Sequence, residues 1–277
     1  AAGKALGPLA GVPLALKDVL AQEGVPTTAG SKILQEWKPP YDSTVVAKLK
    51  AAGVVILGKT NMDEFAMGSS TENSGYGPTF NPWDLTRTPG GSSGGSAAAV
   101  SARIVAVGHA NDGGGSIRVP ASECGLVGLK PSRGRISKGP DTGESWMGAT
   151  VDGVVTRSVR DTALMLDILS GYEAGDPYTA VPYARPLMEE VGKPVGFLRI
   201  GFLDHPLMPG GVDHAETRAS MANTCKLLES LGHMVEDAYP AAMDEEDFAD
   251  TFTGIVSVAT DVGVSEIEAL IGRPVTQ

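Results

Sequence analysis

Cysteine is scarce in this chain of 277 residues, which contains only Cys124 and Cys225. Two cysteines so far apart in the sequence cannot build a disulfide framework, and they lack the spacing of metal ligands. The sequence therefore favours a reducing compartment, and we expect the protein in the cytoplasm. No apolar run reaches the roughly 18 residues of a membrane span, and the N-terminus has no apolar signal-peptide core. Neither a membrane anchor, nor a metal ion, nor an organic cofactor is predicted.

Basic side chains are also in short supply, with 22 Lys and Arg against 33 Asp and Glu and a net charge of −11. Such an acidic balance argues against direct binding of nucleic acid, whose phosphates need a basic surface. Aromatic residues make up only 5% of the chain, whereas glycine is abundant at 36 residues. This is about twice the usual share of roughly 7%. The excess predicts tight turns and backbone that approaches something closely.

The apolar pattern predicts an α/β fold. Residues 12–16 form a short buried strand candidate, a helix capped by Asp42 or Ser43 runs to Lys50, and residues 54–57 form a second strand candidate. This order indicates a mixed, largely parallel sheet with helices on both faces, in a single domain over residues 1–277. Further strands are expected at 104–107, 125–129, 195–203 and 233–239, with a loop at 171–186. Helices are expected from a cap at Ser158 to a stop at Gly171, and at 215–231. Residues 187–277 carry no chemistry that the sequence reveals.

Two glycine-serine tracts interrupt this pattern, at residues 89–96 and 111–118. Glycines free the backbone to adopt positive φ and to present N–H groups, and a small hydroxyl residue can open a helix. The simplest interpretation of such a tract is a flexible linker or a helix cap. Both tracts lie between buried apolar segments, however, where a flexible linker is out of place.

Two known motifs can be compared with the tracts. Neither tract ends in Gly-Lys-Ser/Thr or contains G-x-G-x-x-G, so a nucleotide-binding loop is poorly supported. The nucleophile elbow G-x-S-x-G matches formally at Ser92 or Ser93, but it should follow a strand, and residues 83–89 have the composition of a loop. Because four histidines are present (109, 205, 214 and 233), a serine esterase of the α/β-hydrolase type stays an open alternative. His109 is more typical of a packed histidine than of a base.

Several motifs, taken in order, resemble the amidase signature family. They are Gly7 to Pro13, Lys17-Asp18, Thr27 to Ser31, Gly58 to Asn61, Asn81-Pro82-Trp83 and both glycine-serine tracts. The resemblance is dense over residues 7–135 and continues more thinly to about residue 171. It implies the amidase-signature fold, which extends beyond this chain at both ends, so we expect a domain that is incomplete here.

The resemblance implies a Ser/cis-Ser/Lys triad that cleaves amide C–N bonds without a cofactor. Lys17 matches the family's lysine, Ser92 its cis-serine and Ser116 its nucleophile. A serine hydroxyl needs a base, and a lysine serves as one only when burial lowers its pKa from about 10.4. The apolar residues before Lys17 agree with such burial, whereas the alternative for Lys17 taken alone is a surface ion pair with Asp18. Ser92, after a cis peptide bond, would pass the proton between Ser116 and Lys17.

The second tract also implies an oxyanion hole, formed by backbone N–H groups of residues 113–116 (Gly113, Gly114, Gly115 and Ser116). The family usually carries a side chain where Gly113 stands, but the donor is a backbone group and survives this difference. Asp112 and Arg118 match positions expected to brace the two loops, with a plain surface ion pair as the alternative. Met67 and Gly68 resemble the stretch lining the substrate cleft, and Ser93 is expected beside the site. Residues 138–150, including Trp146, are expected to influence the choice of substrate.

Two kinds of amidase remain possible within the family. Residues 59–100 resemble the A subunit of glutamyl-tRNA(Gln) amidotransferase, a glutaminase that works with a tRNA-binding partner. After the nucleophile, residues 130–140 and 152–155 resemble free-standing amidases instead; the amidotransferase subunit is expected to have Asp-Gln where Asp152-Gly153 stands. We therefore expect a free-standing hydrolase of a small-molecule amide, with a carbamate or ester as a related substrate. The amidotransferase subunit is the alternative, a catalytically silent binding module is a weaker one, and a homodimer stays open.

Overall fold

The computed structural model describes residues 6–206, 210–245 and 247–275. These residues form two compact units that divide between Val191 and Gly192, and each unit is described by itself. The prediction of one domain over residues 1–277 stays a prediction. The first unit contains both glycine-serine tracts and everything that positions the candidate site.

A five-stranded sheet organises the first unit, with the strand order β2-β1-β3-β5-β4. The strands are β1 (Pro13–Lys17), β2 (Val55–Thr60), β3 (Val107–Asp112), β4 (Val127–Gly128) and β5 (Val151–Thr156). β1 pairs in parallel with both β2 and β3, whereas β5 runs antiparallel to β3 and β4. Lys17 at the end of β1 and Asp112 at the end of β3 therefore lie at the same edge of the sheet, where ligands usually bind in α/β folds.

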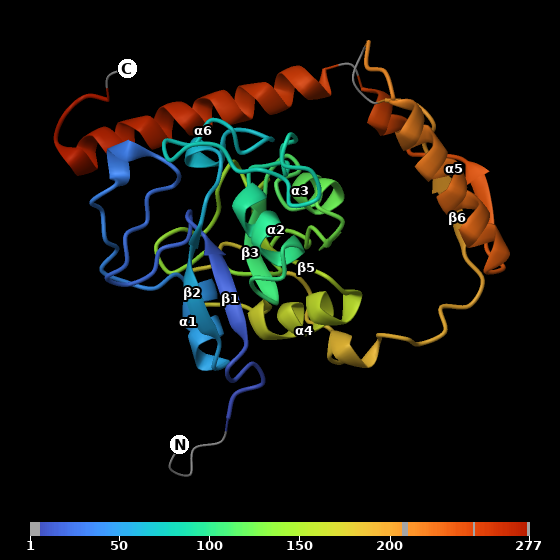
Figure 1. The fold of residues 1–277 in the computed structure, drawn as a ribbon, viewed down its shortest axis with the longest axis horizontal. Helices are drawn as coiled ribbons and strands as arrows, with labels where there is room; N and C mark the ends of the chain where they lie inside the picture. Colours follow the sequence, from blue (N-terminus) through green and yellow to red (C-terminus); the bar gives the residue numbers. More distant parts are fainter. Residues whose placement is uncertain (1–5, 207–209, 246, 276–277) are drawn as a thin grey trace. The chain divides into compact units, whose positions relative to one another are not determined.

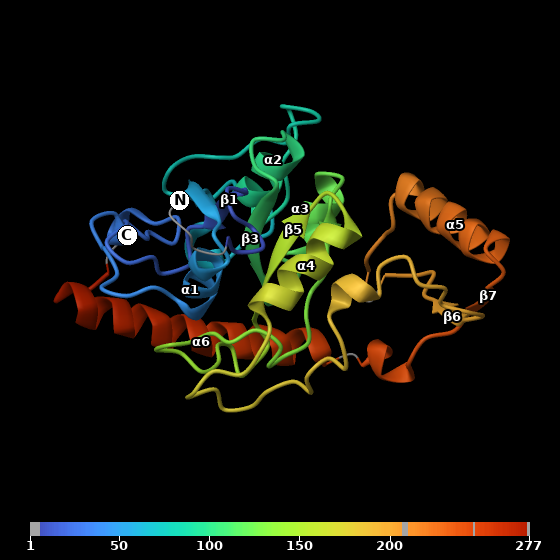
Figure 2. The same ribbon diagram turned by 90° about the horizontal axis from the view of Figure 1, so that it is seen from below.

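Helices cover both faces of this sheet, as predicted. One apolar cluster joins Leu14, Leu16 and Val107 to α1 (Thr44–Ala51) and α4 (Val159–Leu169), which lie near one another in Figures 1 and 2. A second cluster joins Ala15, Ala110 and Val155 to α2 (Gly94–Ser101) and α3 (Arg118–Glu123). The alternation of Leu14, Ala15 and Leu16 between the two clusters follows from the two-residue period of a strand. Short 3₁₀ turns complete the unit, namely η1 (Lys32–Leu34), η2 (Glu64–Ala66) and η3 (Leu187–Glu189).

The helix starts follow the capping residues that the sequence predicted. The Ser43 hydroxyl accepts a hydrogen bond from the Val46 N–H at the start of α1. The Ser158 hydroxyl accepts one from the Asp161 N–H at the start of α4. Each bond satisfies one of the N–H groups that a helix leaves without a partner at its first turn. Helix α4 ends at Leu169, two residues before the predicted stop at Gly171.

Three strands of this sheet differ from the prediction, and two of them, β3 and β5, carry residues of the site. The strand predicted at 104–107 begins at Val107 and continues to Asp112, into the second glycine-serine tract. Strand β5, which the apolar pattern did not predict, pairs with all six residues of β3. Because β5 offers hydrogen-bond partners along the whole of β3, β3 continues as a strand as far as Asp112. The strand predicted at 125–129 shrinks to the two residues of β4.

The second unit contains a two-stranded parallel sheet of β6 (Arg199–Phe202) and β7 (Met234–Asp237), joined by α5 (Ala215–Ser230). These elements lie within the segments predicted at 195–203, 233–239 and 215–231. Helix α6 (Phe248–Ile271) was not predicted, and the 3₁₀ turn η4 (Ala241–Asp244) precedes it. Across the residues that the structure describes, every helix falls short of the length and apolar character that crossing a lipid bilayer requires.

Candidate active site

Lys17 and Ser92 meet in the interior, as the triad hypothesis requires. The Lys17 Nζ atom donates a hydrogen bond to the Ser92 Oγ atom at 2.6 Å. Both side chains are fully buried. The two residues are 75 positions apart in the sequence, and they come together because β1 ends beside the start of α2. Ser116 is half-buried, precedes α3 and lines an adjacent cavity.

The surroundings of Lys17 favour its neutral form. Burial lowers its pKa from 10.5 to about 7, although the carboxylates of Asp152, Asp63 and Asp112 act in the opposite direction. The Nζ atom also donates to the Asn111 Oδ1 atom at 2.5 Å. A lysine that titrates near neutral pH is able to accept a proton from a hydroxyl group. No sequence motif had indicated a role for Asn111.

Asp152 forms a second buried charge cluster beside Lys17. Its carboxylate lies 3.2 Å from the Lys138 Nζ atom and 3.4 Å from the Nε2 atom of the fully buried His109. Burial alone would raise the pKa of Asp152, but Lys138 and His109 outweigh this and hold the pKa well below its usual range. Burial lowers the pKa of His109. His109 is therefore a packed histidine, as the sequence indicated. Asp152 was missed as part of the site, and the contact of Lys138 with it was not predicted.

Strand register brings these side chains together. Asn111 pairs with Asp152, and His109 pairs with Val154, across the antiparallel β3–β5 ladder. Residues two apart on one strand face the same side, so His109 and Asn111 both reach the side on which Asp152 stands. Only a prediction of β5 and its register could have found this group from the sequence.

Asp112 braces the loop that carries Ser116. Its carboxylate accepts hydrogen bonds from the N–H groups of Gly115 at 2.8 Å and Ile117 at 3.2 Å. The Arg118 guanidinium adds two bonds of 2.9 Å. These contacts agree with the bracing role expected for Asp112 and Arg118. The Gly115 N–H thus already donates to Asp112, unlike the expectation that it would serve an oxyanion. An oxyanion hole formed by the N–H groups of Gly113, Gly114 and Ser116 stays a prediction.

The peptide bond between Gly91 and Ser92 is cis, as the resemblance implied. A Cβ atom at Gly91 would lie 2.1 Å from the Asp63 Oδ2 atom and 2.7 Å from the Ser70 N atom. A Cβ atom at Gly68 would lie 2.5 Å from the Asp63 Cγ atom. Glycine is thus required at both positions, and the segment from Asp63 to Ser70 packs directly against the first tract. The first glycine-serine tract is therefore closely packed against a neighbouring segment and is not a flexible linker.

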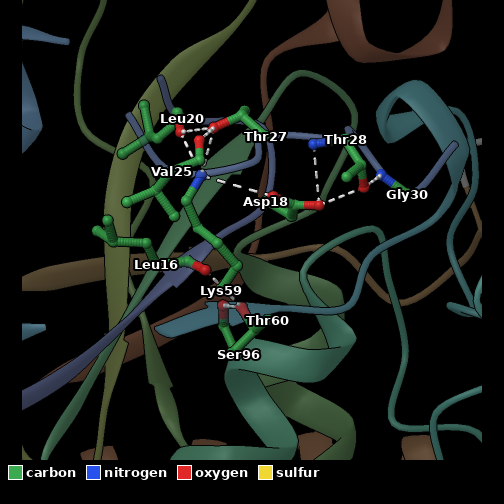
Figure 3. A network of polar contacts seen from close by, with 10 residues as sticks. All are labelled: Leu16, Asp18, Leu20, Val25, Thr27, Thr28, Gly30, Lys59, Thr60 and Ser96. Carbon is green, nitrogen blue, oxygen red and sulfur yellow. Dashed lines mark hydrogen bonds and ion pairs between the residues drawn. The ribbon is translucent and has the colours of Figure 1, made fainter. Parts of the chain in front are cut away.

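A polar network fixes the loop that follows Lys17 (Figure 3). The Lys59 Nζ atom donates to the Leu20 carbonyl at 2.6 Å and to the Thr27 hydroxyl at 2.8 Å, and it lies 3.5 Å from Asp18. Asp18 in turn accepts hydrogen bonds from the N–H and hydroxyl of Thr28. Asp18 therefore pairs with Lys59 and not with Lys17, which removes the surface ion pair considered for Lys17.

The cavity beside Ser116 has a volume of about 280 Å³. Its wall includes aromatic side chains, charged side chains and the loop that precedes β5. The lining residues are Val19, Leu20, Ala21, Tyr41, Ser43, Phe65, Ala66, Asn111, Gly113, Ser116, Lys138, Gly139, Asp141, Thr142, Ser145, Trp146, Thr150 and Asp152. Residues 138–150 thus contribute to the wall, and their influence on the choice of substrate stays a prediction. The stretch around Met67 contributes Phe65 and Ala66, and contact of Met67 or Gly68 with substrate stays a prediction.

Comparison with known proteins now identifies the family. The family model described as Amidase matches residues 1–264. This chain belongs to the amidase family. It is 42% identical to the 6-aminohexanoate-cyclic-dimer hydrolase of Paenarthrobacter ureafaciens over 99% of this chain and 56% of that protein. It is 49% identical to the A subunit of the glutamyl-tRNA(Gln) amidotransferase of Streptomyces coelicolor over 83% of this chain and 46% of that protein.

A solved structure of 6-aminohexanoate cyclic dimer hydrolase complexed with substrate shares the fold of this amidase-family chain. The TM-score is 0.94 at 41% identity, over 99% of this chain and 58% of that chain. The predicted amidase-signature fold is therefore confirmed. The chain spans about half the length of the curated relatives that it matches.

The nucleophile-elbow alternative does not fit this amidase-family site. The residues before Ser92 form no strand, and the hydrogen-bond partner of Ser92 is a lysine, not a histidine. Ser93 is fully buried, and its hydroxyl donates to the Asn111 carbonyl at 3.5 Å. Ser93 therefore links the start of α2 to β3 from beside the site. Within the described ranges, His, Cys, Asp and Glu side chains form no group of three or more that could hold a metal ion.

Proposed function

We propose that this protein hydrolyses the amide C–N bond of small, uncharged amides through an acyl-enzyme on Ser116. The observation that carries the proposal is the contact between Ser92 and a buried lysine. The Lys17 Nζ atom lies 2.6 Å from the Ser92 Oγ atom, and burial lowers the lysine pKa to about 7. A base of this pKa beside a hydroxyl is what a serine nucleophile needs at neutral pH.

Acylation would begin with attack of the Ser116 Oγ atom on the amide carbonyl carbon. The Ser116 proton passes to the Ser92 oxygen while the Ser92 proton passes to the neutral Lys17 amine. The carbonyl oxygen becomes an oxyanion, which the N–H groups of Gly113, Gly114 or Ser116 would stabilise. One such donor is worth about 2.7–4 kcal/mol of barrier. Collapse of this intermediate breaks the C–N bond, and the leaving nitrogen takes its proton from Ser92, which recovers one from Lys17.

Deacylation would use the same groups with water in place of the amine. Water loses its proton through Ser92 to Lys17 as its oxygen attacks the ester carbon. The second tetrahedral intermediate releases the carboxylic acid, and the Ser116 oxygen takes the proton back. A carbamate would follow the same sequence, because it offers the same carbonyl carbon and leaving nitrogen.

Two observations favour an amide other than glutamine as the substrate. The similarity to 6-aminohexanoate-cyclic-dimer hydrolases extends over 99% of this chain, against 83% for the Streptomyces amidotransferase chain. The second observation is the glycine at position 153. The amidotransferase subunit is expected to have a glutamine at the matching position. A Cβ atom at Gly153 would lie 2.8 Å from the Ile117 Cδ1 atom and 3.3 Å from the Pro131 Cδ atom. A side chain at this position therefore requires the Ile117 side chain to move, and the space as it stands suits glycine.

The glutaminase subunit of an amidotransferase is the second candidate, and the 49% identity to the Streptomyces amidotransferase chain supports it. That function requires ammonia transfer to a partner that binds tRNA. The oligomeric state, including a homodimer, and the cytoplasmic location stay predictions.

The test compares three substrates on purified protein, namely 6-aminohexanoate cyclic dimer, an aryl amide and glutamine. Without a partner chain, we expect ring opening of the cyclic dimer, which exposes a new amino group, and release of the aryl amine from the aryl amide. Ser116→Ala should give neither product. Ser92→Ala and Lys17→Ala should each lower kcat/KM by about 10³-fold or more, and the double variant should lose little further, since the residues act as a unit. Ser101→Ala, at the far end of α2, is the matched control. Wild-type turnover by Ser116→Ala, or hydrolysis of glutamine alone, would reject the proposal.

A further inference from the structure

Gly113 and Trp146 fit together beside the nucleophile. A Cβ atom at Gly113 would lie 2.9 Å from the Trp146 Cζ3 atom, 3.0 Å from its Cε3 atom and 2.9 Å from the Thr150 Cγ2 atom. The indole thus occupies the space that a side chain at position 113 would take, three residues before Ser116. Protein interiors are close-packed, so any larger residue at position 113 has to displace the indole or Thr150. The sequence marked Gly113 as a departure from the family pattern, and the indole gives this departure a physical reason.

The loop holds Trp146 in place. The Ala149 N–H donates to the Trp146 carbonyl at 3.0 Å, and the Gly148 N–H donates to the Ser145 carbonyl at 3.1 Å. Trp146 and Met147 have φ values of +52° and +53°. Non-glycine residues keep this conformation only where the surrounding structure enforces it, and such residues cluster at functional sites. Trp146 consequently lines the cavity, whereas Met147 is 74% exposed.

The same cavity has a second wall of this kind. Phe65 and Ala66 also have positive φ values, of +51° and +63°, and both line the cavity. Tyr41 adds a third aromatic ring. Part of the wall next to Ser116 therefore consists of aromatic rings, and polar and charged side chains form the rest.

The charged groups in the cavity wall are already paired. Lys138 and Asp152 form an ion pair of 3.2 Å. Burial and a hydrogen bond to Asp141 raise the pKa of Tyr41, so the Asp141 carboxylate accepts from that hydroxyl. A charged substrate group would compete with these partners and would lose hydration on entering the cavity. An uncharged apolar group avoids this cost and buries its surface against the rings.

We propose that Gly113 and Trp146 form a matched pair that selects amides carrying an uncharged apolar chain next to the scissile bond. Gly113 leaves room for the indole, and the indole supplies an apolar wall beside Ser116. The proposal rests on the proposed function, because it places the reacting carbonyl at Ser116. The apolar chain belongs to the acyl group or to the amine, and the two arms of the test distinguish these sources.

The measured quantity is the ratio of kcat/KM for a long chain to that for a short chain. The acyl arm compares hexanoyl with acetyl p-nitroanilide, and the amine arm compares N-hexyl with N-methyl acetamide. Each buried methylene favours binding by about fourfold, at roughly 0.8 kcal/mol. We expect a wild-type ratio well above ten in one arm, and a fall of about tenfold or more in that arm for Trp146→Ala. Trp146→Phe should retain most of the ratio. Met147→Ala is the matched control at the neighbouring exposed position and should leave the ratio unchanged.

A double-mutant cycle tests the pairing itself. Gly113→Thr should lower the ratio by displacing the indole. In Gly113→Thr/Trp146→Ala the threonine no longer meets the indole, and only the Thr150 methyl group has to shift. The ratio should therefore match that of Trp146→Ala alone, whereas independent sites would give additive losses. Far-UV circular dichroism and thermal unfolding show whether each variant folds, and Trp146→Leu replaces Trp146→Ala if that variant does not.

The outcomes separate this proposal from the proposed function. Calorimetric binding of hexanamide and acetamide to Ser116→Ala measures chain preference without turnover, and Trp146→Ala in this background should abolish the preference. Suppose that the wild-type protein hydrolyses amides. The Gly113–Trp146 proposal is then wrong if the chain-length ratio of Trp146→Ala stays within twofold of the wild-type ratio in both arms. It is also wrong if the losses in the double-mutant cycle are additive. If no amide is hydrolysed, the proposed function fails, and the binding preference still decides the role of the pair.

Discussion

Asn111 accepts a hydrogen bond from the Lys17 Nζ atom at 2.5 Å, across the parallel pairing of β1 and β3. A neutral amine has two N–H donors and one lone pair. The Asn111 Oδ1 atom only accepts hydrogen bonds, so an N–H of Lys17 points to it in either protonation state. Once Lys17 is neutral, its lone pair can accept from the Ser92 hydroxyl, 2.6 Å away, to which the charged form donates. Asn111 therefore orients the base as well as touching it.

Replacing Asn111 by aspartate should raise the pKa of Lys17. An opposite charge in direct contact shifts a pKa by about 1–3 units, so the acid limb of the kcat/KM profile should move to higher pH by that amount. Activity lost at pH 7 should return at alkaline pH. The control variant Asp42→Asn, whose carboxylate pairs with the exposed Lys50, should leave the profile unchanged. An unshifted limb in Asn111→Asp would show that Lys17 is not the group that titrates.

Asp152→Asn should shift the same limb in the opposite direction. Asp152 is the first of three carboxylates that raise the pKa of Lys17, the others being Asp63 and Asp112, while Lys138 lowers it. Loss of the Asp152 charge should therefore lower the pKa of Lys17 and move the acid limb to lower pH. The substitution also leaves Lys138 and buried His109 without their partner, which should cost about 3–5 kcal/mol of unfolding free energy. A limb that moves to higher pH would contradict this assignment.

The positions of Lys17, Ser92 and the helix caps could be predicted because each is encoded locally. Ser43 and Ser158 precede apolar helical patterns, and the lysine and serine belong to contiguous motifs. The contacts of Asn111 with Lys17, and of Asp152 with His109, could not be predicted in this way. They depend on the pairing of β3 with β5, and the polar residue Asp152 and the glycine at 153 break the apolar pattern of a strand. The Gly113–Trp146 contact joins two loops whose conformations no sequence periodicity describes.

Helix α6 was missed for a related reason. It contains glycines at 254 and 263 and a high content of β-branched residues, all of which lower helix propensity. Local propensity therefore did not mark it as a helix.

Lys17→Met should abolish activity and change how stability depends on pH. In the unfolded chain Lys17 keeps its proton up to about pH 10.5, whereas in the folded protein it loses the proton near pH 7. Between these values the unfolded state binds more protons, so the wild-type free energy of unfolding should rise with pH. Relative to Lys17→Met, it should rise by about 3 kcal/mol between pH 7 and 9.5, at ~1.36 kcal/mol per pKa unit. Urea denaturation of both proteins at the two pH values measures this. A difference that does not change with pH would mean that Lys17 stays charged when folded.

Gly95→Ala tests whether the first glycine-serine tract is a site of close packing. A Cβ atom at Gly95 would lie 2.5 Å from the Asn61 carbonyl oxygen and 2.6 Å from the Asn61 N atom. These are backbone atoms, and the Gly95 N–H donates to the same carbonyl at 3.1 Å, so the added methyl group cannot be accommodated by a change of rotamer. We expect a loss of about 1–3 kcal/mol or more in the free energy of unfolding.

Gly254→Ala makes the same chemical change where nothing lies within 4 Å of the added atom, in the interior of α6. There alanine should be neutral or stabilising by about 0.5–1 kcal/mol, because glycine loses more backbone freedom in a helix. Urea denaturation followed by circular dichroism compares the two variants with the wild type. If Gly95→Ala were as stable as Gly254→Ala, the tract would tolerate side chains, and its glycines would have to be explained by flexibility instead of by the approach of Asn61.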